Sequence, residues 1–129
     1  MPQPGWTNEE IYLLADRGYA FYRQGNYQEA VIIFSALTVL DPASAYCRTA
    51  LAVLCMLTGD FRRALDELSA VLQQNPANHA ARARRCEAYC EMKAWNEATK
   101  DLEILRRNGA TLHVRRLTSR MQAVGAAVR

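Results

Sequence analysis

The feature that most constrains this chain is a pattern that returns every 34 residues. Ala30 returns as Ala64 and again as Ala98, and Gly25 returns as Gly59. Self-similarity at a fixed period of this length is the signature of stacked helical hairpins. Three copies fit into the 129 residues. The sequence therefore predicts an all-α array of helix–turn–helix units.

Capping residues and helix breakers divide the chain into seven predicted helices. Thr7 and Glu10 form a capping box at the start of the first helix, and Pro42 and Pro76 end the second and the fourth. Lys93 stands where the third turn should have its glycine, which predicts a turn with a poorer local preference. The predicted helices cover about 8–24, 27–40, 44–58, 61–74, 78–92, 95–107 and 111–127.

The same register predicts the organisation of the chain. We expect a flexible tail over 1–6, three repeats within 7–110 and a capping helix over 111–129, because an end repeat needs one polar outer face. The repeats are expected at about 11–44, 45–78 and 79–110. The arginines of the last helix are interpreted as solvated surface.

Composition and charge exclude several classes of protein. Residues 1–64 hold five Lys/Arg and six Asp/Glu, and residues 65–129 hold eleven and seven, so no dense basic stripe for nucleic acid is present. No apolar run is long enough for a membrane helix, and the first residues lack a signal-peptide layout. We expect a cytoplasmic protein without membrane insertion.

No catalytic, metal or cofactor site is expected. His79 and His113 are far apart and lack a nucleophile or carboxylate partner, and no Gly-rich phosphate loop exists. The four cysteines form no C-x-x-C pair, which favours small buried side chains in a reducing compartment over a metal or redox site. They are Cys47, Cys55, Cys86 and Cys90.

The periodicity resembles the tetratricopeptide repeat, a 34-residue helix–turn–helix unit, over about Ile11–Ala110. The resemblance implies three such repeats in a right-handed α-solenoid, closed by the capping helix. Small or large apolar residues occur where that family packs its two helices together. They are Leu14, Gly18, Phe21, Ala30, Phe34 and Leu37 in repeat one; Leu51, Ala52, Cys55, Ala64, Leu68 and Val71 in repeat two; and Cys86, Tyr89, Ala98, Leu102 and Leu105 in repeat three.

Four arginines depart from that family pattern. Arg17 and Arg85 occupy a position that is usually Leu, and Arg48 and Arg82 occupy another that is usually bulky and apolar. Either the packing there is disturbed, or the stems are buried while the charged heads reach water.

A second stripe on the first helix of each hairpin indicates a binding groove. Tyr12, Ala15, Tyr19 and Tyr22 recur at helical spacing, apart from the packing stripe. The family places this stripe on its concave surface, and tyrosine suits peptide capture because it is rigid, large and polar at its tip. The alternative is that the tyrosines complete the core. The candidate groove residues are Tyr12, Ala15, Tyr19, Tyr22, Arg23, Tyr46, Thr49, Val53, Met56, Leu57, Glu87 and Cys90.

A narrower resemblance rests on the stretch Tyr22–Pro42, which reads Y-R-Q-G-N-Y-Q-E-A-x-x-x-F-x-x-L-x-x-L-D-P. It is similar to the first repeat of the tetratricopeptide chaperones of bacterial type III secretion systems, and the chain is also as compact as their needle and export-component chaperones. Cys86-Glu87-Ala88 loosely matches the A-E-C stretch of their third repeat. The contacts that this resemblance implies are Tyr12, Tyr19, Tyr22, Tyr46, Val53 and Met56.

The resemblance implies a bacterial cytoplasmic chaperone whose partner is a segment of a secretion substrate. The chain lacks the long N-terminal arm of that family, which puts an arm-mediated homodimer in doubt, and a homodimer or co-chaperone stays open. A general tetratricopeptide adaptor for a cytosolic complex is the alternative. An adaptor that recognises a carboxylate needs cations in its groove, and Arg23 is the only clear one in repeats one and two.

Overall fold

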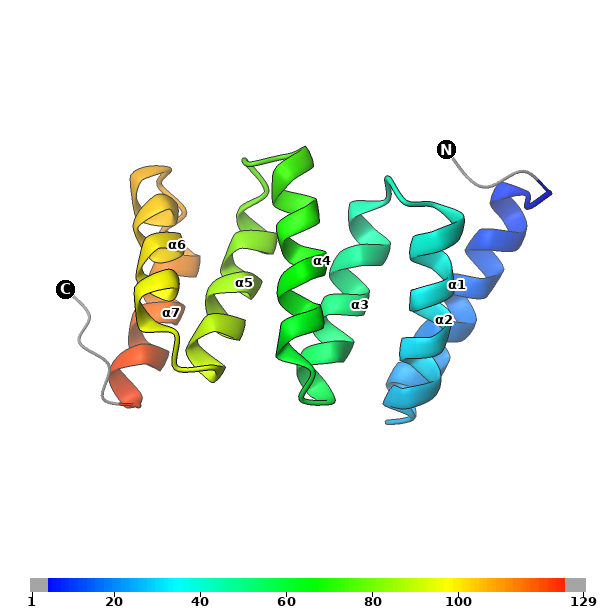
Figure 1. The fold of residues 1–129 in the computed structure, drawn as a ribbon, viewed down its shortest axis with the longest axis horizontal. Coiled ribbons are helices and arrows are strands. Elements are labelled where there is room, and N and C mark those ends of the chain that lie inside the picture. Colours follow the sequence, from blue (N-terminus) through cyan, green and yellow to red (C-terminus); the bar gives the residue numbers. More distant parts are fainter. Residues whose placement is uncertain (1–4, 125–129) are drawn as a thin grey trace. The chain divides into compact units, whose positions relative to one another are not determined.

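The computed structural model describes residues 5–124, and these residues form seven α-helices and no strand (Figure 1). The all-α prediction is confirmed. The helices are α1 (Asn8–Arg23), α2 (Tyr27–Leu40), α3 (Ala45–Leu57), α4 (Phe61–Gln74), α5 (His79–Glu91), α6 (Trp95–Arg107) and α7 (Thr111–Ala123).

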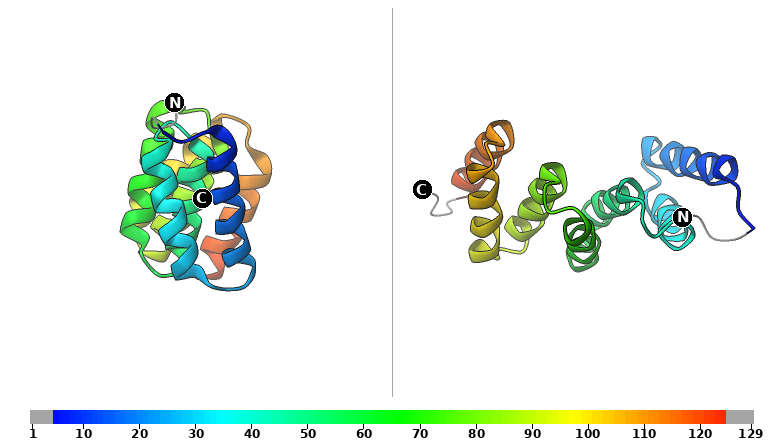
Figure 2. Two further views of the ribbon diagram at one scale, coloured as in Figure 1. Left: turned by 90° about the vertical axis from the view of Figure 1, so that its right-hand side faces the viewer. Right: turned by 90° about the horizontal axis from the view of Figure 1, so that it is seen from above.

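The chain divides into two compact units, and the boundary falls within α4. In unit 1 (residues 1–67), α1 and α2 form a hairpin and α3 packs against α2; in unit 2 (residues 68–129), α5 and α6 form a hairpin and α7 packs against both (Figure 2). Unit 1 carries five Lys/Arg and eight Asp/Glu, a net charge of −3, whereas unit 2 carries eleven and five, a net charge of +6. The two units therefore differ in electrostatic character.

The capping signals set the helix limits. The Thr7 hydroxyl accepts a hydrogen bond from the Glu10 amide at 3.1 Å, and a Glu10 carboxylate oxygen accepts one from the Thr7 amide at 3.1 Å, so the predicted capping box is confirmed. The first six helices begin and end within one residue of the predicted limits. The seventh ends at Ala123, before the predicted end near Ala127, which lies outside the described residues together with residues 1–4 of the predicted tail.

Three equivalent turns end the first helix of each hairpin in the left-handed region. The φ angles are +79° at Gly25, +84° at Gly59 and +58° at Lys93. The left-handed conformation costs more free energy for a residue with a side chain than for glycine. The third turn therefore forms, as predicted, with a residue that favours its conformation less than glycine does.

A close approach of α1 and α2 explains why Gly18 has no side chain. A Cβ at Gly18 would lie 2.7 Å from Cε2 of Phe34 and 3.0 Å from Cγ2 of Ile33. Phe34 is 1% exposed, so its ring cannot move aside without disturbing the core. In unit 2 the equivalent residues, Cys86 and Leu102, share one core cluster, so a smaller partner there allows a larger first-helix side chain.

Two of the arginines at the departing positions, Arg48 and Arg82, are each held by a carboxylate and a turn carbonyl. Arg48 donates to the Pro42 carbonyl at 2.9 Å and pairs with Glu67 at 2.9 Å. One period later, Arg82 donates to the Pro76 carbonyl at 3.1 Å and pairs with Asp101. The repeat therefore reuses one polar bridge, in which an arginine joins the preceding turn to the second helix of its hairpin.

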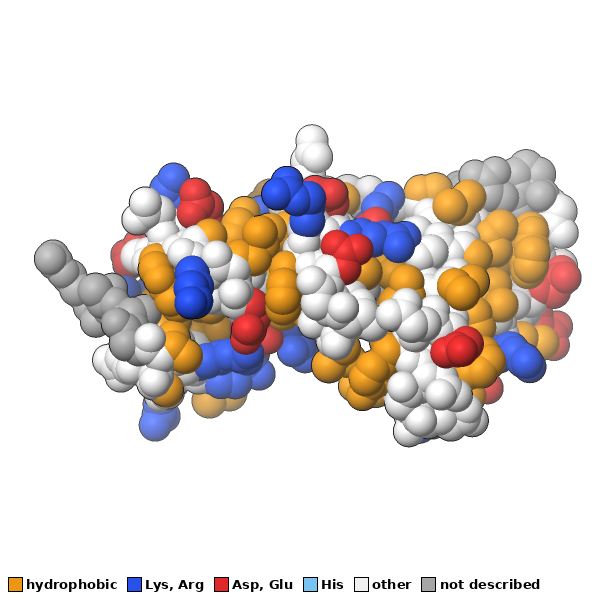
Figure 3. All heavy atoms as spheres, turned by 60° about the horizontal axis from the view of Figure 1, so that its bottom comes forward, with side chains coloured by type: hydrophobic (Ala, Val, Ile, Leu, Met, Phe, Trp, Pro, Cys, Tyr) orange, Lys and Arg blue, Asp and Glu red, His pale blue; other side chains and the backbone are white. Residues whose placement is uncertain are grey.

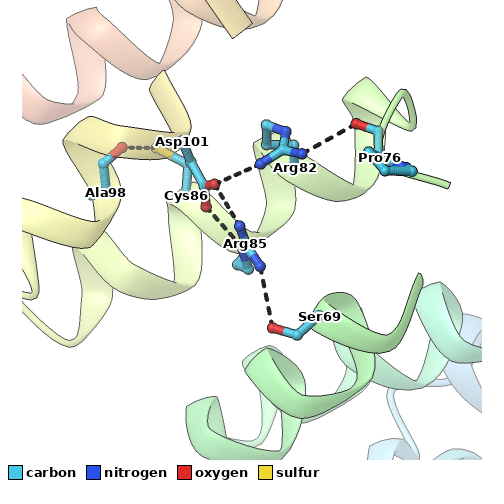
Figure 4. A network of polar contacts seen from close by, with 7 residues as sticks. All are labelled: Ser69, Pro76, Arg82, Arg85, Cys86, Ala98 and Asp101. Carbon is cyan, nitrogen blue, oxygen red and sulfur yellow. Dashed lines mark hydrogen bonds and ion pairs between the residues drawn. The ribbon is translucent and has the colours of Figure 1, made fainter. Parts of the chain in front are cut away.

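In unit 2 this bridge is a buried network (Figure 4). The Asp101 carboxylate is 2% exposed and accepts from Arg82 at 3.1 Å and from Arg85 at 2.9 and 2.7 Å, and Arg85 also donates to Ser69. The hydrogen bond to Asp101, ahead of the opposing effect of burial, raises the pKa of Arg85. Arg82 is 7% exposed, so the second of the two alternatives, a charged head that reaches water, does not hold for this residue.

The cysteines are small buried side chains, as predicted. All four are free thiols and at most 8% exposed. The Cys86 thiol donates to the Ala98 carbonyl at 3.3 Å. A hydrogen bond between the thiols of Cys86 and Cys90, followed by burial, raises the pKa of Cys86, and the same bond lowers the pKa of Cys90.

Candidate functional site

The most distinctive surface of unit 1 is a pocket of about 360 Å³ between α1 and the start of α3. We call it the tyrosine pocket. Its aromatic side chains come from both helices, and Asp41 and Ser44 come from the turn before α3. The lining residues are Asn8, Ile11, Tyr12, Ala15, Asp16, Tyr19, Asp41, Ser44, Tyr46 and Cys47.

The tyrosines of the pocket divide into one anchored ring and two exposed ones. Tyr19 is half-buried and meets the ring of Phe34 edge-on, with centroids 5.7 Å apart and planes at 81°. It also contacts the ring of Tyr46 at 6.0 Å. Tyr12 and Tyr46 are 75% and 53% exposed. The core therefore positions Tyr19, while Tyr12 and Tyr46 offer aromatic surface to solvent.

Local structure places these rings. The capping box at Thr7 fixes the first turn of α1, from which the stripe of Tyr12 and Tyr19 follows at helical spacing. Ser44 caps α3, because its hydroxyl accepts from the Cys47 amide at 3.2 Å. Tyr46 lies within this first turn of α3 and thus faces α1 across the pocket.

The lining of the pocket includes acidic and neutral polar groups. Asp16 and Asp41 contribute carboxylates, Asn8 and Ser44 contribute neutral polar groups, and none of the described residues that line the pocket is Lys or Arg. Partial burial, and next a hydrogen bond with Tyr19, raise the pKa of the Tyr46 hydroxyl well above its ordinary value. Tyr46 is therefore a neutral phenol at physiological pH, with an apolar face and a polar tip.

Hydrophobic side chains are not confined to the pocket. Figure 3 shows them, in orange, gathered over the part of unit 1 that contains α1 and α2. Several of the large ones are more than 60% exposed, namely Tyr12, Leu13, Ile32 and Val39.

The structure brings together four of the residues predicted to line a groove. Tyr12, Ala15, Tyr19 and Tyr46 share the tyrosine pocket. The others of unit 1 lie outside it. Tyr22 contacts the ring of Tyr27 at 5.9 Å, Arg23 and Leu57 are exposed, and Thr49, Val53 and Met56 are half-buried on α3.

The two predicted groove residues of unit 2 are covered. Glu87 is 5% and Cys90 is 8% exposed. Arg116 and Arg120 of α7 pair with the Glu87 carboxylate at 3.2 and 3.8 Å, and Cys90 belongs to a core cluster that includes Leu117 of α7. The expectation that they line an open groove is therefore wrong: α7, which the sequence predicts only as a capping helix, closes this face.

Sequence reasoning missed the polar members of the pocket. Asp16 stands four residues after Tyr12, which places both side chains on one side of α1 and is a usable signal. At Asp41 the sequence indicates only the end of a helix, and nothing nearby shows that the turn faces α1.

No group of His, Cys, Asp and Glu within residues 5–124 could hold a metal ion, and no helix there is long and apolar enough to cross a membrane.

Comparison with known proteins identifies the family. Residues 9–43 and residues 56–120 each match a tetratricopeptide repeat family model. The second match alone covers half of the sequence, and this chain belongs to the tetratricopeptide repeat family. It is a protein-binding module and not an enzyme.

One curated relative shares part of the sequence. Mouse (Mus musculus) trafficking protein particle complex subunit 12 is 29% identical over 70 residues, which are 54% of this chain and 9% of that protein. The chain therefore spans only a small part of the curated relative that it matches.

Three examples represent the solved structures that share the fold. The Yersinia enterocolitica type III secretion translocator chaperone SycD aligns with a TM-score of 0.79 at 18% identity, covering 91% of each chain. PcrH of Pseudomonas aeruginosa, in complex with the chaperone binding region of PopD, aligns with a TM-score of 0.81 at 20% identity, covering 93% of this chain and 94% of that one. The first repeat domain of Spaghetti (RPAP3), bound to the HSP90 peptide SRMEEVD, aligns with a TM-score of 0.75 at 22% identity, covering 93% and 99%.

Proposed function

We propose that this protein is a cytoplasmic bacterial chaperone of a type III secretion system, and that its tyrosine pocket holds a short segment of an export substrate. The observation that supports this most is the open pocket of about 360 Å³, where Tyr12 and Tyr46 present exposed rings beside an anchored Tyr19. The resemblance to SycD and PcrH is one of fold, and it agrees with this use of the surface.

The chemistry of the pocket suits capture without an energy source. An export substrate has apolar segments that aggregate when they are left exposed. A preformed pocket can cover one such segment reversibly, because rigid tyrosines lose little conformational freedom on binding. Two or three aromatic anchors correspond to an affinity in the micromolar range, about −8 kcal/mol.

The charge of the pocket selects among segments. Its lining holds the carboxylates of Asp16 and Asp41, and unit 1 as a whole has a net charge of −3. Like charges disfavour an acidic segment, so we expect neutral or basic apolar segments. Arg23, the candidate cation for a carboxylate, lies outside the pocket.

A second candidate function is a general adaptor in a cytosolic protein complex. The RPAP3 domain bound to the HSP90 peptide SRMEEVD and the mouse trafficking subunit support this alternative through fold and partial sequence similarity. The peptide in that structure carries acidic residues near its end, which the electrostatics of the tyrosine pocket disfavour. Preference between acidic and basic segments therefore separates the two functions.

A selection from a displayed library of random peptides, each about twelve residues long, tests the pocket directly. We expect enrichment of apolar and aromatic residues together with Lys or Arg, and depletion of Asp and Glu. Selected peptides should bind Tyr12→Ala/Tyr46→Ala at least about tenfold more weakly. Ile32→Ala is the matched control, because this side chain is 69% exposed on α2 and lies outside the pocket.

Co-expression tests the chaperone assignment. A translocator protein from the same genome should form a soluble complex with the wild-type chain and with Ile32→Ala, and should aggregate with the double tyrosine variant. Enrichment of acidic C-terminal peptides, combined with no complex with any secreted protein, would favour the adaptor instead.

A further inference from the structure

The helix α7 and its C-cap carry a row of exposed side chains that the proposed function does not use. Leu112, Arg116, Arg120 and Val124 follow one another at intervals of four residues, so their side chains are neighbours along the helix. Leu112 is 81% and Val124 is 63% exposed, and the two arginine side chains between them are 55% and 48% exposed. We call these four residues the arginine row. It presents two charged groups between two apolar ends.

The arginine row lies in the basic part of unit 2. Residues 68–103 hold five Lys/Arg and five Asp/Glu, whereas residues 104–129 hold six arginines and no acidic residue. The whole net charge of +6 of unit 2 therefore comes from the stretch that contains the row. A surface of one sign attracts partners of the opposite sign and repels those of its own.

Two carboxylates of α5 hold the guanidiniums of the row in place. Oxygens of Glu87, whose side chain is 7% exposed, lie 3.2 Å from Arg116 and 3.8 Å from Arg120. Arg84 of α5 shares the same carboxylate at 3.4 Å. Arg120 also donates to Glu91 at 2.6 Å. The heads of the two arginines are therefore positioned from the α5 side, while half of each side chain remains exposed.

A comparison with Asp101 shows that the row has donors to spare. Asp101 accepts at 2.7–3.1 Å from two arginines whose side chains are only 9% and 20% exposed. Glu87 instead divides longer contacts among three half-exposed arginines. A guanidinium has five N–H donors in a planar fork that matches a carboxylate. Arg116 uses one nitrogen and Arg120 uses two on the carboxylates of α5, so each can bind a second carboxylate from the solvent side.

The order of groups along the row fits one kind of partner. Side chains four residues apart form the ridges by which helices pack against each other, and the row from Leu112 to Val124 rises by about 18 Å. A helix with apolar, acidic, acidic and apolar residues at the same spacing meets every group with its complement. Two arginines are too few for a nucleic-acid stripe, and a face on which charges interrupt the apolar groups does not suit a membrane surface.

We propose that the arginine row binds an acidic helix of a partner protein, and that two carboxylates four residues apart on this helix pair with Arg116 and Arg120. The row shares no residue with the tyrosine pocket and prefers the opposite charge, so the proposal is independent of the proposed function. Exposed ion pairs contribute little each, and we expect a Kd of about 0.1–1 mM for an isolated helix at low salt. Random peptides of about twelve residues are shorter than the row and form little helix, so their selection reports the tyrosine pocket.

A designed helical peptide tests the proposal. A peptide of about twenty residues carries Leu, Glu, Glu and Leu at intervals of four, with Ala and Gln elsewhere, and NMR chemical shifts of the labelled full chain report its binding. We expect shifts along α7 and a Kd that rises at least about fivefold between about 20 and 300 mM salt. Replacing both Glu of the peptide by Gln, or moving them off the spacing of four, should weaken binding at least about tenfold.

Variants of the chain locate the contact. Loss of the arginines alone would leave a buried carboxylate unpaired, so Glu87→Gln/Arg116→Gln/Arg120→Gln neutralises all three groups together and should bind about tenfold more weakly. Arg107→Gln, exposed on α6 and outside the row, changes the net charge by the same −1 and should bind like the wild type. Leu112→Gln leaves the ion pairs intact and should weaken binding about threefold. Circular dichroism melting verifies that each variant is folded.

Several results would overturn the proposal. They are no shift at about 2 mM peptide, equal binding of the Gln peptide, and unchanged affinity in both Leu112→Gln and the triple variant. Shifts confined to α1 and α3 would mean that the peptide occupies the tyrosine pocket instead. Tighter binding to duplex DNA or to phosphatidylserine vesicles would assign the row to another class of partner. Self-association of the wild-type chain at low salt that the triple variant lacks would make the acidic unit 1 of a second copy the occupant.

Discussion

In unit 1, the space between α1 and the start of α3 holds the ring of Tyr19, which contacts the ring of Tyr46. In unit 2, the space between α5 and α7 holds the carboxylate of Glu87, which pairs with Arg116 and Arg120. Glu87 follows Tyr19 by two periods of 34 residues, so the two side chains occupy equivalent positions of the repeat.

The difference teaches how one scaffold can be open in one place and closed in another. Aromatic rings of fixed shape leave a pocket of about 360 Å³ at the first position. At the second position, ion pairs with Glu87 hold α7 in place, and apolar side chains of α7, among them Leu117 and Met121, complete a core there. Backbone periodicity is shared by both units, and the side chains decide which one offers a surface to a partner.

The largest expected effect compares the two polar bridges. Asp101→Ala leaves Arg82 and Arg85 without their shared carboxylate in a buried site, and we expect a loss of about 3–5 kcal/mol in the free energy of unfolding. Glu67→Ala removes the equivalent carboxylate of unit 1, whose side chain is 15% exposed, and should cost only about 1 kcal/mol. Urea titrations of both variants measure this, and equal losses would contradict the contrast between a buried and a peripheral bridge.

The next effect concerns the buried thiol of unit 1. Burial, the largest cause, raises the pKa of Cys55 from an ordinary 9.0 to about 11. The folded state thus keeps a proton that the unfolded state has lost, so stability is intact below pH 9 and falls by about 2–3 kcal/mol as the pH rises to 11. Unfolding measured across this range should show a shallower loss in Cys55→Ala, and an unchanged slope would mean that other groups dominate.

A smaller effect tests the close approach in the first hairpin. Gly18→Ala places a methyl group against Phe34, and the cost of overpacking, about 1–3 kcal/mol, exceeds a gain in helix propensity of up to about 1 kcal/mol. We expect a net loss of about 1–2 kcal/mol. The second substitution Phe34→Leu, which copies Leu102 of unit 2, should recover part of it in a double-mutant cycle. Strict additivity of the two substitutions would count against the proposed contact.

The smallest effect concerns the third turn. Lys93 has a φ of +58°, which is unfavourable for a residue with a side chain. Lys93→Gly removes this strain, so the free energy of unfolding should rise by about 0.5–1 kcal/mol. The reciprocal substitution Gly25→Lys in the first turn should lower it by a similar amount. Thermal melting of the two variants measures the pair, and a stabilised Gly25→Lys protein would show that turn conformation is not the cause.

Most of the fold could be predicted because it depends on local signals. The capping box at Thr7, the turn glycines and the 34-residue period set helix limits within one residue for α1 to α6. The conformational cost of the third turn could also be predicted, because Lys93 alone replaces the expected glycine. These features depend on neighbours in the sequence, which a pattern can reveal.

The surface could be predicted only in part, because it depends on which residues meet from distant elements. The stripe of Tyr12 and Tyr19 is visible in the sequence, since helical spacing places both on one side of α1. The burial of Glu87 is not, because it requires the arginines of α7, which lies far along the chain and reads as solvated surface. The pairing of Arg85 with Asp101 likewise depends on the packing of α5 against α6.

The affinity of a selected basic–apolar peptide for two variants, measured by fluorescence anisotropy, tests the central claim most directly. We predict a Kd in the micromolar range for the wild-type chain, a Kd about 10–100-fold higher for Tyr12→Ala/Tyr46→Ala, and no change for Ile32→Ala. Because both rings are largely exposed, the melting temperature of the double variant should stay within about 4 °C of the wild type. Undiminished affinity, or a collapse of stability in the double variant, would show that the tyrosines do not form a vacant binding surface.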